Sequence, residues 1–528
     1  MRRFAQLLEN LVFTPGRNAK LAHLTRYFRE VPDPDRGRAL AALAGALDLP
    51  SVTPSRIRGL VEERVDPVLL RLSYDYVGDL AETVALIWPG ETEGEVPTLS
   101  EAVEMLQVSG PIQAGKALVT LCDRMGPSER LALLKLATGG LRVGVSGRLV
   151  RTALAQMAAD HAGRDLARIE ELWFELTPPY ADLFAWLDGG PEPDVDLSLS
   201  FRPVMLANPL EDDRINLLKE NDFLAEWKWD GIRIQATSNG VERRLYTRTG
   251  DEISTAFPEV IQSMSWQGTV DGELLVVRDG QVAPFADLQK RLGRKRVGPK
   301  TMAEAPGHLR LYDILADETQ DLRALPLVER RAHLAEWMAR HQPERTDMSD
   351  EIAFNSWVEL AEIRAGARAD GQEGLMLKRR DAAYTGGRPM GPWFKWKRDP
   401  LSADCVMIYA QRGHGKRSSY YSDFTFAAWR DGAEGPELVP VGKAYSGYTD
   451  EELLQLDRWI RNNTVDRFGP VRAVSPEIVL EIAFDAVQRS TRHKSGIAMR
   501  FPRIKRIRWD KPAAEADRLG TLEAMIQG

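Results

Sequence analysis

The chain has 528 residues, which is long enough for three or four domains with more than one hydrophobic core. Hydrophobic residues make up 43% and charged residues 28%, as in a soluble globular protein, and with a net charge of −7 any binding of nucleic acid must depend on local basic patches. The two cysteines, Cys122 and Cys405, exclude a disulfide framework and a four-cysteine zinc site, and they fit a reducing cytosol.

The first third of the chain is predicted to be helical. Residues 1–13 form an amphipathic pattern without the apolar core of a signal peptide, and no apolar run reaches transmembrane length, so we expect a soluble, cytoplasmic protein. Apolar residues recur at three- and four-residue spacing as far as about residue 188. Residues 187–203 are rich in Gly, Pro and Asp and predict a linker that buries little apolar surface.

Strands replace helices after about residue 204. We predict strands over residues 223–238, 241–250, 268–277 and 308–316, and a helix over residues 327–341. After residue 398 come short strands over residues 404–413, 422–432 and 437–447, followed by a helix at 449–463. Thr449 and Glu452 form a capping-box pattern at the start of that helix. Short strands around one helix suit a small barrel such as an OB-fold, so we place domains at residues 1–195, 200–398 and 399–528.

The sequence AEWKWDGIRIQ at residues 225–235 places Lys228 between two tryptophans, shortly before a carboxylate and an arginine. A lysine in a mostly apolar strand can lose solvation and reach a lowered pKa, and Arg233 would depress that pKa further. The neutral amine would then be a nucleophile toward a phosphoryl centre. A half-buried lysine paired with Asp230 at a strand edge is the alternative, and Lys-x-Asp-Gly alone does not decide between the two.

Further charged and aromatic residues follow in order along the chain. They are Arg248 in a turn, Asp271 and Glu273 on one face of a strand, Tyr312, Glu373 beside a glycine, and Lys395 and Lys397 on one face of a strand. Two separated carboxylates suit a hard divalent cation, and the aromatic ring offers a surface on which a base can stack. Together with the cations, they are what the binding and attack of a nucleoside triphosphate require.

This ordered set resembles the motifs of the covalent nucleotidyltransferases, and most closely those of the ATP-dependent DNA ligase family. The resemblance implies a multidomain fold with an all-α DNA-binding domain, an α+β nucleotidyltransferase (ATP-grasp-like ligase) domain and a C-terminal OB-fold β-barrel. It implies a monomeric enzyme that seals nicks in double-stranded DNA with ATP and Mg²⁺ or Mn²⁺, through a lysyl-AMP intermediate. It does not indicate a membrane partner.

The resemblance also implies a role for each matched residue. Lys228 would attack the α-phosphate, and Lys395 and Lys397 would contact it. Glu226 and Tyr312 would contact adenine, whereas Arg233, Arg248 and Glu273 would hold the ribose and the phosphates. Glu273 and Glu373 would also lie near the metal. Arg388 resembles an arginine that the family places shortly before the lysine pair, with a spacing one residue longer than expected.

Residues 488–511 carry nine Lys or Arg and one acidic residue, interleaved with apolar residues. This pattern favours a phosphate-binding face on a barrel, and a solvated charged face is the alternative. The resemblance implies that Arg508, Asp510 and Lys511 orient the pyrophosphate leaving group, an element that NAD-dependent ligases lack. Arg500 and Arg503 belong to the same segment and are predicted to contact DNA.

Residues 139–147, GGLRVGVSG, lie before a predicted helix, with Arg142 and Arg148 beside them. Backbone amides at such a position, with arginines nearby, suit contacts with DNA phosphates. A helix–helix connection with glycine caps is the alternative. For the whole chain, the competing functions are another nucleotidyltransferase, such as an RNA ligase or an mRNA-capping guanylyltransferase, and a non-catalytic DNA-binding scaffold. Replication, repair and recombination are not distinguished by the sequence, nor are the preferred metal, the protein partners or the tolerance for RNA.

Overall fold

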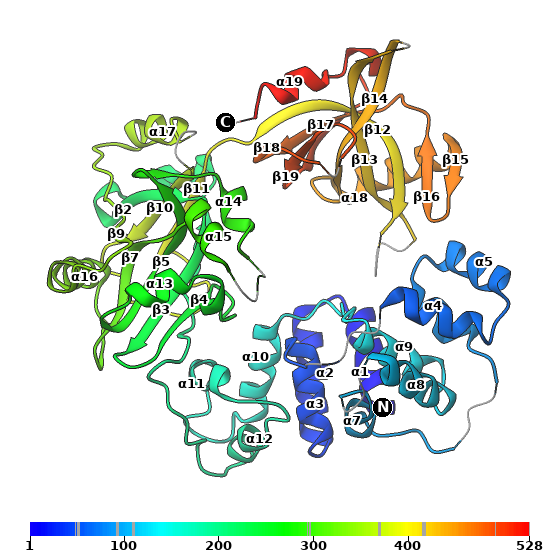
Figure 1. The fold of residues 1–528 in the computed structure, drawn as a ribbon, viewed down its shortest axis with the longest axis horizontal. Helices are drawn as coiled ribbons and strands as arrows, with labels where there is room; N and C mark the ends of the chain where they lie inside the picture. Colours follow the sequence, from blue (N-terminus) through cyan, green and yellow to red (C-terminus); the bar gives the residue numbers. More distant parts are fainter. Residues whose placement is uncertain are drawn as a thin grey trace. The chain divides into compact units, whose positions relative to one another are not determined.

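The computed structural model describes residues 1–47, 49, 53–90, 94–107, 111–292, 294, 297–367, 371–413, 419–433, 435–491 and 493–526. The chain forms two compact units, one of residues 1–157, 178–181 and 400–528 and the other of residues 158–177 and 182–399. Figure 1 shows helical, mixed and strand-rich parts in this order along the chain. Among the residues described, no helix is long and apolar enough to cross a bilayer.

The N-terminal part is helical throughout its described residues, as the apolar spacing predicts. Its helices are α1 (Arg2–Phe13), α2 (Arg17–Glu30), α3 (Asp35–Ala44), α4 (Pro54–Glu62), α5 (Pro67–Val77), α6 (Leu80–Ile87), α7 (Leu99–Gln107), α8 (Pro111–Asp123), α9 (Pro127–Ala137), α10 (Gly147–Met157), α11 (Leu166–Leu172) and α12 (Ala181–Leu187). Helix α2 packs against α10, and α1 against α9. The carboxylate of Asp35 accepts hydrogen bonds from the backbone N–H groups of Leu99 and Ser100, which ties the start of α3 to the start of α7.

The predicted linker differs from the expectation in its second half. Phe201 is buried together with Val204, and its ring meets the rings of Phe174 and Tyr246 edge to face at 4.7 and 5.7 Å. The backbone of Arg202 exchanges two hydrogen bonds with the buried side chain of Gln235. The expectation that residues 187–203 bury little is therefore wrong for their last residues, because these residues pack against Gln235 and Tyr246 of the sheet that follows.

The second unit contains two sheets. The first has the order β1-β11-β10-β2, built from β1 (Asn208–Pro209), β2 (Phe223–Trp229), β10 (Gln372–Arg379) and β11 (Trp393–Lys397). The second has the order β4-β3-β5-β7-β8, with β6 beside β5 and β9 beside β7; its strands are β3 (Ile232–Asn239), β4 (Arg243–Thr247), β5 (Gln267–Arg278), β6 (Gln281–Val282), β7 (Gly307–Asp317), β8 (Gln320–Asp321) and β9 (Thr346–Met348). The short strands β1 and β9 pair in parallel and all other pairs are antiparallel.

Helices cover these sheets, and they are α13 (Pro258–Ser263), α14 (Phe285–Gln289), α15 (Pro299–Glu304), α16 (Leu327–His341) and α17 (Trp357–Ala365). The core of the second sheet includes Trp266 and Trp337, whose rings meet edge to face at 5.0 Å. The core of the first sheet includes Trp357 of α17 and Trp396 of β11. Helix α16 spans the residues that the sequence predicts.

The predicted strand over residues 223–238 is two strands that belong to different sheets. The chain leaves β2 at Trp229 and enters β3 at Ile232. A Cβ atom on Gly231 would lie 2.6 Å from the carbonyl oxygen of Leu274 and 2.7 Å from Cγ of Glu273. Because only glycine permits so close an approach, the chain crosses between the sheets at this residue. The prediction of one continuous strand is therefore wrong.

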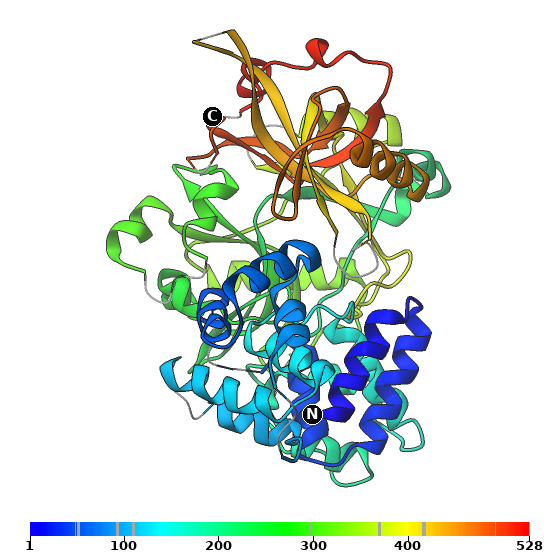
Figure 2. The ribbon, with the colours of Figure 1, turned by 90° about the vertical axis from the view of Figure 1, so that its right-hand side faces the viewer.

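The C-terminal part is rich in strands. They are β12 (Leu401–Arg412), β13 (Tyr421–Gly432), β14 (Gly435–Ala444), β15 (Thr464–Phe468), β16 (Val471–Val474), β17 (Val479–Phe484), β18 (Ala486–Arg489), β19 (Ile497–Arg500) and β20 (Arg503–Arg508), with helices α18 (Asp450–Asn462) and α19 (Leu519–Glu523). Strand β12 pairs with β17 over its first half and with β16 over its second. Helix α18 lies against β13, and Figure 2 shows it beside the strands. The predicted capping box of Thr449 and Glu452 is confirmed.

Candidate active site

Lys228 lies near the end of β2, and its Nζ donates to Oε2 of Glu373 on β10 at 2.5 Å. Burial alone lowers the pKa of Lys228, but the carboxylates of Glu373, Glu273 and Asp230 outweigh burial and raise the pKa above its ordinary value. The expectation of a lowered pKa is therefore wrong for this structure. Arg233 does not reverse this balance, and its guanidinium is paired with Asp271.

Two carboxylates from different sheets act on Lys228. Burial raises the pKa of Glu273 to about 8, and this rise persists although Lys228 and Arg233 oppose it. Burial also acts to raise the pKa of Glu373, but Lys228 and Lys397 outweigh it and lower that pKa. The Nζ of Lys397 lies 3.8 Å from Oε2 of Glu373. The pKa values of the two glutamates are therefore shifted in opposite directions, although both carboxylates act on the same amine.

The donor set fits a hard divalent cation. Carboxylate oxygens are preferred ligands of Mg²⁺, which usually takes one or two of them and completes its shell with water and substrate phosphates. Glu273 and Glu373 are two such donors, and both act on Lys228. Within the described part of the chain, no cluster of three or more His, Cys, Asp or Glu side chains could hold a metal.

Cations gather around Lys395 on β11. Burial, followed by the positive charges of Arg388, Lys397, Lys228 and Arg248, lowers the pKa of Lys395. The register of β10 and β11 places Lys395 opposite Met376 and Lys397 opposite Gly374. Arg248, Arg388 and Lys397 are exposed. The structure therefore brings together the cations that the sequence singles out, and their overlapping fields favour a polyanion such as a triphosphate.

Arg233 of β3 is held in a buried ion pair. Its Nε and Nη2 donate to the two carboxylate oxygens of Asp271 at 3.0 and 2.6 Å, and its Nη1 donates to the carbonyl of Met205 at 2.5 Å. Tyr384 donates to Asp271 at 2.5 Å. Burial acts to lower the pKa of Arg233, but Asp271 and the two neighbouring tyrosines, Tyr312 and Tyr384, raise it well above its ordinary value. Arg233 therefore carries a permanent positive charge, and its guanidinium is held in place by Asp271 and Met205.

Glu226 is buried beside two cations that the sequence analysis did not identify. The Nζ of Lys378 donates to Oε2 of Glu226 at 2.7 Å, and Arg331 of α16 donates to Oε1. Lys378 also lies 3.9 Å from the centre of the Tyr312 ring. One signal was available in the sequence, because Lys378 ends an apolar strand segment as Lys228 does. Arg331 gave no comparable signal, because it lies in an ordinary helix with many charges.

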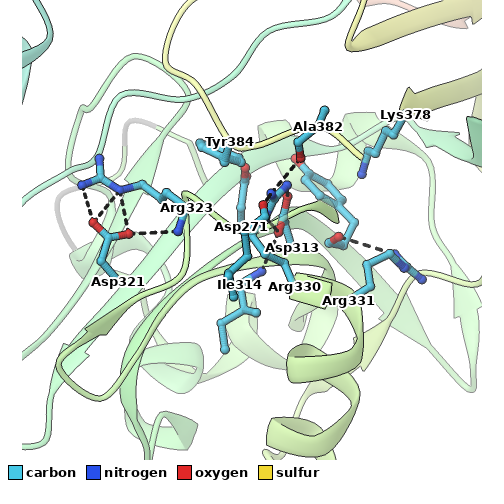
Figure 3. A network of polar contacts seen from close by, with 12 residues as sticks. Asp271, Asp313, Ile314, Asp321, Arg323, Arg330, Arg331, Lys378, Ala382 and Tyr384 are labelled. Carbon is cyan, nitrogen blue, oxygen red and sulfur yellow. Dashed lines mark hydrogen bonds and ion pairs between the residues drawn. The ribbon is translucent and has the colours of Figure 1, made fainter. Parts of the chain in front are cut away.

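A second buried network lies on the other sheet, at β7. Arg330 of α16 and Asp313 of β7 are fully buried and form a two-point ion pair at 2.8 and 2.9 Å. Arg330 also donates to the carbonyl of Ala382 at 3.0 Å. Figure 3 shows Asp313, Arg330, Asp271 and Tyr384 close together in this network. Consecutive arginines of α16 therefore hold β7 and β2, the strands of Tyr312 and Lys228.

The C-terminal candidates lie on β19, on β20 and directly after β20. Arg508 and Lys511 both contact Oδ2 of Asp404, at 3.3 and 2.8 Å, and Arg508 also pairs with Asp510. Arg503 pairs with Asp485 at 3.2 Å, and the Arg500 guanidinium lies 5.3 Å from the ring centre of Phe501. Of the interleaved apolar residues, Ile504 and Ile507 are buried, whereas Phe501 and Trp509 are exposed. Residue 492 of the basic segment lies outside the described residues.

The N-terminal candidates Arg142 and Arg148 are exposed around the start of α10. The Nζ of Lys20 donates to the carbonyls of Val143 and Gly144 at 2.7 and 3.0 Å, which holds the loop between the two arginines. Oγ of Ser146 accepts from the backbone N–H of Leu149 as a helix cap. The backbone of this loop is therefore held by Lys20 and by the Ser146 cap.

A half-buried lysine that is paired with Glu373 and feels the charge of Glu273, beside a group of cations in a two-sheet fold, is the arrangement of a nucleotidyltransferase. Residues 204–397 match the family described as ATP dependent DNA ligase domain, and residues 417–511 match ATP dependent DNA ligase C terminal region. The chain belongs to the ATP-dependent DNA ligase family. The family and enzyme class predicted from the sequence are confirmed, and the RNA ligase, capping-enzyme and scaffold alternatives are not supported.

Relatives cover nearly the whole chain. The probable DNA ligase of Koribacter versatilis is 33% identical over 100% of this chain and 96% of its own length. DNA ligase 1 of Korarchaeum cryptofilum is 30% identical over 98% of this chain and 96% of its own. The solved structure named Pmar-Lig_PreS3 shares the fold, with a TM-score of 0.63 over 96% of this chain and 99% of that chain at 16% identity. A helical N-terminal region, a nucleotidyltransferase core and a strand-rich C-terminal region are thus shared.

Proposed function

We propose that this ligase seals nicks in duplex DNA by three phosphoryl transfers that begin at Lys228. The observation that carries the proposal is the pairing of Lys228 with Glu373 at 2.5 Å, within reach of the charge of Glu273 and beside the cations around Lys395. The Nζ lone pair attacks the α-phosphorus of ATP, the N–P bond forms, the bond to the pyrophosphate oxygen breaks and Nζ loses a proton. The DNA 5′-phosphate then displaces Lys228 from AMP, and the 3′-hydroxyl displaces AMP to join the strand.

Proton loss from Lys228 is a demanding part of the first transfer, because the adjacent carboxylates favour the ammonium form. Oε2 of Glu373, at 2.5 Å, is placed to hold or accept that proton. When bound, a divalent cation held by Glu273 and Glu373 would supply positive charge that weakens the hold of these carboxylates on the ammonium. The lysines and arginines around Lys395 stabilise the charge on the α-phosphoryl group.

The remaining residues complete the proposal. Glu226 and Tyr312 contact adenine. Arg233 and Arg248, together with Glu273, hold the ribose and the phosphates. Arg388, Lys395 and Lys397 contact the phosphates as well. Arg508 and Lys511 orient pyrophosphate, and Arg142, Arg148, Arg500 and Arg503 contact DNA. The strand-rich part with α18 supports an OB-fold, and domains of residues 1–195, 200–398 and 399–528 act together as a cytoplasmic monomer. Mg²⁺ or Mn²⁺ is the metal.

Labelling and sealing assays test this proposal. Incubation with α-labelled ATP and Mg²⁺ is expected to leave covalent label on the protein, with no label from GTP, and sealing of a nicked duplex is expected with ATP but not with NAD. Lys228→Ala is expected to lose the label and yet join a nick that already carries 5′-AMP, because that last transfer does not use the amine. Label on Lys228→Ala, or label from GTP alone, would overturn the proposal.

A further inference from the structure

Trp229, the last residue of β2, is held by an arginine from the other sheet. The guanidinium carbon of Arg310 on β7 lies 4.2 Å from the centre of the Trp229 ring. The same guanidinium donates through Nε and Nη2 to the two carboxylate oxygens of Asp347 on β9, at 2.9 and 2.7 Å. Its face thus holds the ring while its edge holds the carboxylate, an arrangement that the planar guanidinium permits and a lysine does not.

Arg310 is part of a row of charged residues across the second sheet. The strand registers pair Arg233 with Glu273, Glu273 with Arg310, and Arg310 with Asp347. Residues paired directly across neighbouring strands point to the same face of a sheet. Leu309 and Leu311, on either side of Arg310, belong to the apolar core on the opposite face. Arg310 is therefore one strand away from Glu273 and on the same face.

The position of Lys228 depends on both sheets. Its ion-pair partner Glu373 lies in the first sheet, whereas Glu273 lies in the second. At this point the chain joins the sheets only through Asp230 and Gly231. The contact between Arg310 and Trp229 adds a side-chain connection one residue after Lys228.

We infer that Arg310, anchored by Asp347, is a positioning residue that fixes Trp229 and thereby holds Lys228 in line for attack on the α-phosphate. The inference rests on the proposed role of Lys228 as the nucleophile. Arg310 acts through Trp229 and does not itself contact the reacting atoms. It gives a role to the tryptophan that follows the nucleophile, which the sequence analysis did not explain.

The test separates the transfer that needs Lys228 from the one that does not. Arg310→Met removes both the ring contact and the ion pair. Under single-turnover conditions with ATP and Mg²⁺, we expect enzyme adenylylation to slow by about 10- to 100-fold, because small displacements of a reacting group cost rates of this order. Sealing of a nick that already carries 5′-AMP is expected to stay within about twofold of the wild type, since the amine takes no part in it.

Arg340→Met is the matched control. Arg340 also forms a two-point pair with a carboxylate of β7, Asp317, at 2.7 and 2.5 Å, and none of its described contacts is with Trp229. We expect neither rate to change in this variant. Asp347→Asn keeps the arginine but weakens its anchor, and we expect a smaller loss of adenylylation alone. This variant also serves if Arg310→Met does not fold.

The double variant Arg310→Met with Trp229→Leu completes the cycle. If Arg310 acts through Trp229, the double variant is expected to be no slower in adenylylation than the slower of the two single variants. The inference would be overturned if the losses of adenylylation rate in the two single variants multiplied in the double variant. Equal losses in both transfers would also overturn it, as would wild-type adenylylation in both Arg310→Met and Asp347→Asn. Covalent label on Lys228→Ala would instead show that the proposed function has failed.

Discussion

Both cysteines are buried in apolar surroundings, which makes their thiols inert. Burial raises the pKa of Cys122 to about 12 and raises the pKa of Cys405 as well. Because the thiolate is the reactive form, we expect no reaction of the native protein with Ellman's reagent at pH 8. Two equivalents are expected to react in denaturant, one for each cysteine. Fast reaction of the native protein would contradict the buried positions.

Asp347 makes stability depend on pH in a defined direction. Burial acts to raise its pKa, but the hydrogen bonds from Arg310 and the nearby His308 ring, whose Nε2 lies 3.1 Å from Oδ2, prevail and lower the pKa to about 2. Since an unfolded aspartate titrates near pH ~3.9, the carboxylate stabilises the fold above that pH and loses its contribution as the pH falls toward about 2.

Asp347→Asn tests this linkage. We expect the variant to have a lower free energy of unfolding than the wild type at pH 7, with a difference that stays constant down to about pH 5 and shrinks below about pH 4. Urea unfolding monitored by tryptophan fluorescence across this pH range measures the difference. A gap that widens in acid would show that the carboxylate does not have a lowered pKa.

At the level of single residues, the order of motifs in the sequence identifies the lysine, the carboxylates and the cations that the fold brings together. It does not reveal the sign of the pKa shift of Lys228, because Glu373 approaches from 145 residues farther along the chain. Lys378 is likewise 152 residues from Glu226. Local spacing carries no information about such partners, and the electrostatic result depends on them.

At the level of elements, the turn that carries Arg248 rests on an aromatic ring. Gly250 has φ = +89°, and a Cβ atom there would lie 2.1 Å from Cε1 of Phe174. Gly240 has the same φ of +89°, but the nearest atom to its Cβ would be 3.7 Å away. A comparison of alanine substitutions at the two glycines therefore distinguishes the stability lost through backbone strain from the stability lost through a steric clash.

Alanine substitutions at these two glycines are expected to differ. Gly240→Ala is expected to lose about 1–2 kcal/mol of stability from the left-handed backbone alone. Gly250→Ala is expected to lose about 1–3 kcal/mol more because the methyl group displaces the Phe174 ring, and its KM for ATP is expected to rise as Arg248 moves. Chemical unfolding and adenylylation kinetics measure both quantities. Equal stability losses would show that the ring can move aside freely.

Helices and long strands follow from periodicity, and α16 and α18 show this well. The break between β2 and β3 does not follow, because the alternation of residue types continues across Asp230 and Gly231 while the chain changes sheets. Strands β1 and β9, of two and three residues, are too short for any pattern and form only because β11 and β7 lie beside them. Tertiary pairing decides such elements.

At the level of the whole molecule, a chain of net charge −7 must bind DNA through local cations. Each phosphate contact contributes about 0.9 to the slope of log K against log salt concentration. We expect Arg142→Gln and Arg148→Gln each to weaken binding to nicked duplex DNA and to make that slope shallower by about 0.9. Arg2→Gln, which removes an exposed arginine of α1, is the charge-matched control and is expected to leave the slope unchanged. Fluorescence anisotropy over a salt series measures the slopes.

The parallel pairing of β1 with β11 has a consequence for biosynthesis. Asn208 pairs with Phe394, and Pro209 with Lys395, so the first sheet cannot close until nearly 190 later residues have left the ribosome. Glu226 likewise gains Lys378 only after 152 later residues have been made. A fragment that begins at residue 204, where the family match begins, would also leave Gln235 and Tyr246 without their partners. We therefore expect a fragment of residues 158–399 to be produced as a soluble protein where one of residues 204–399 aggregates.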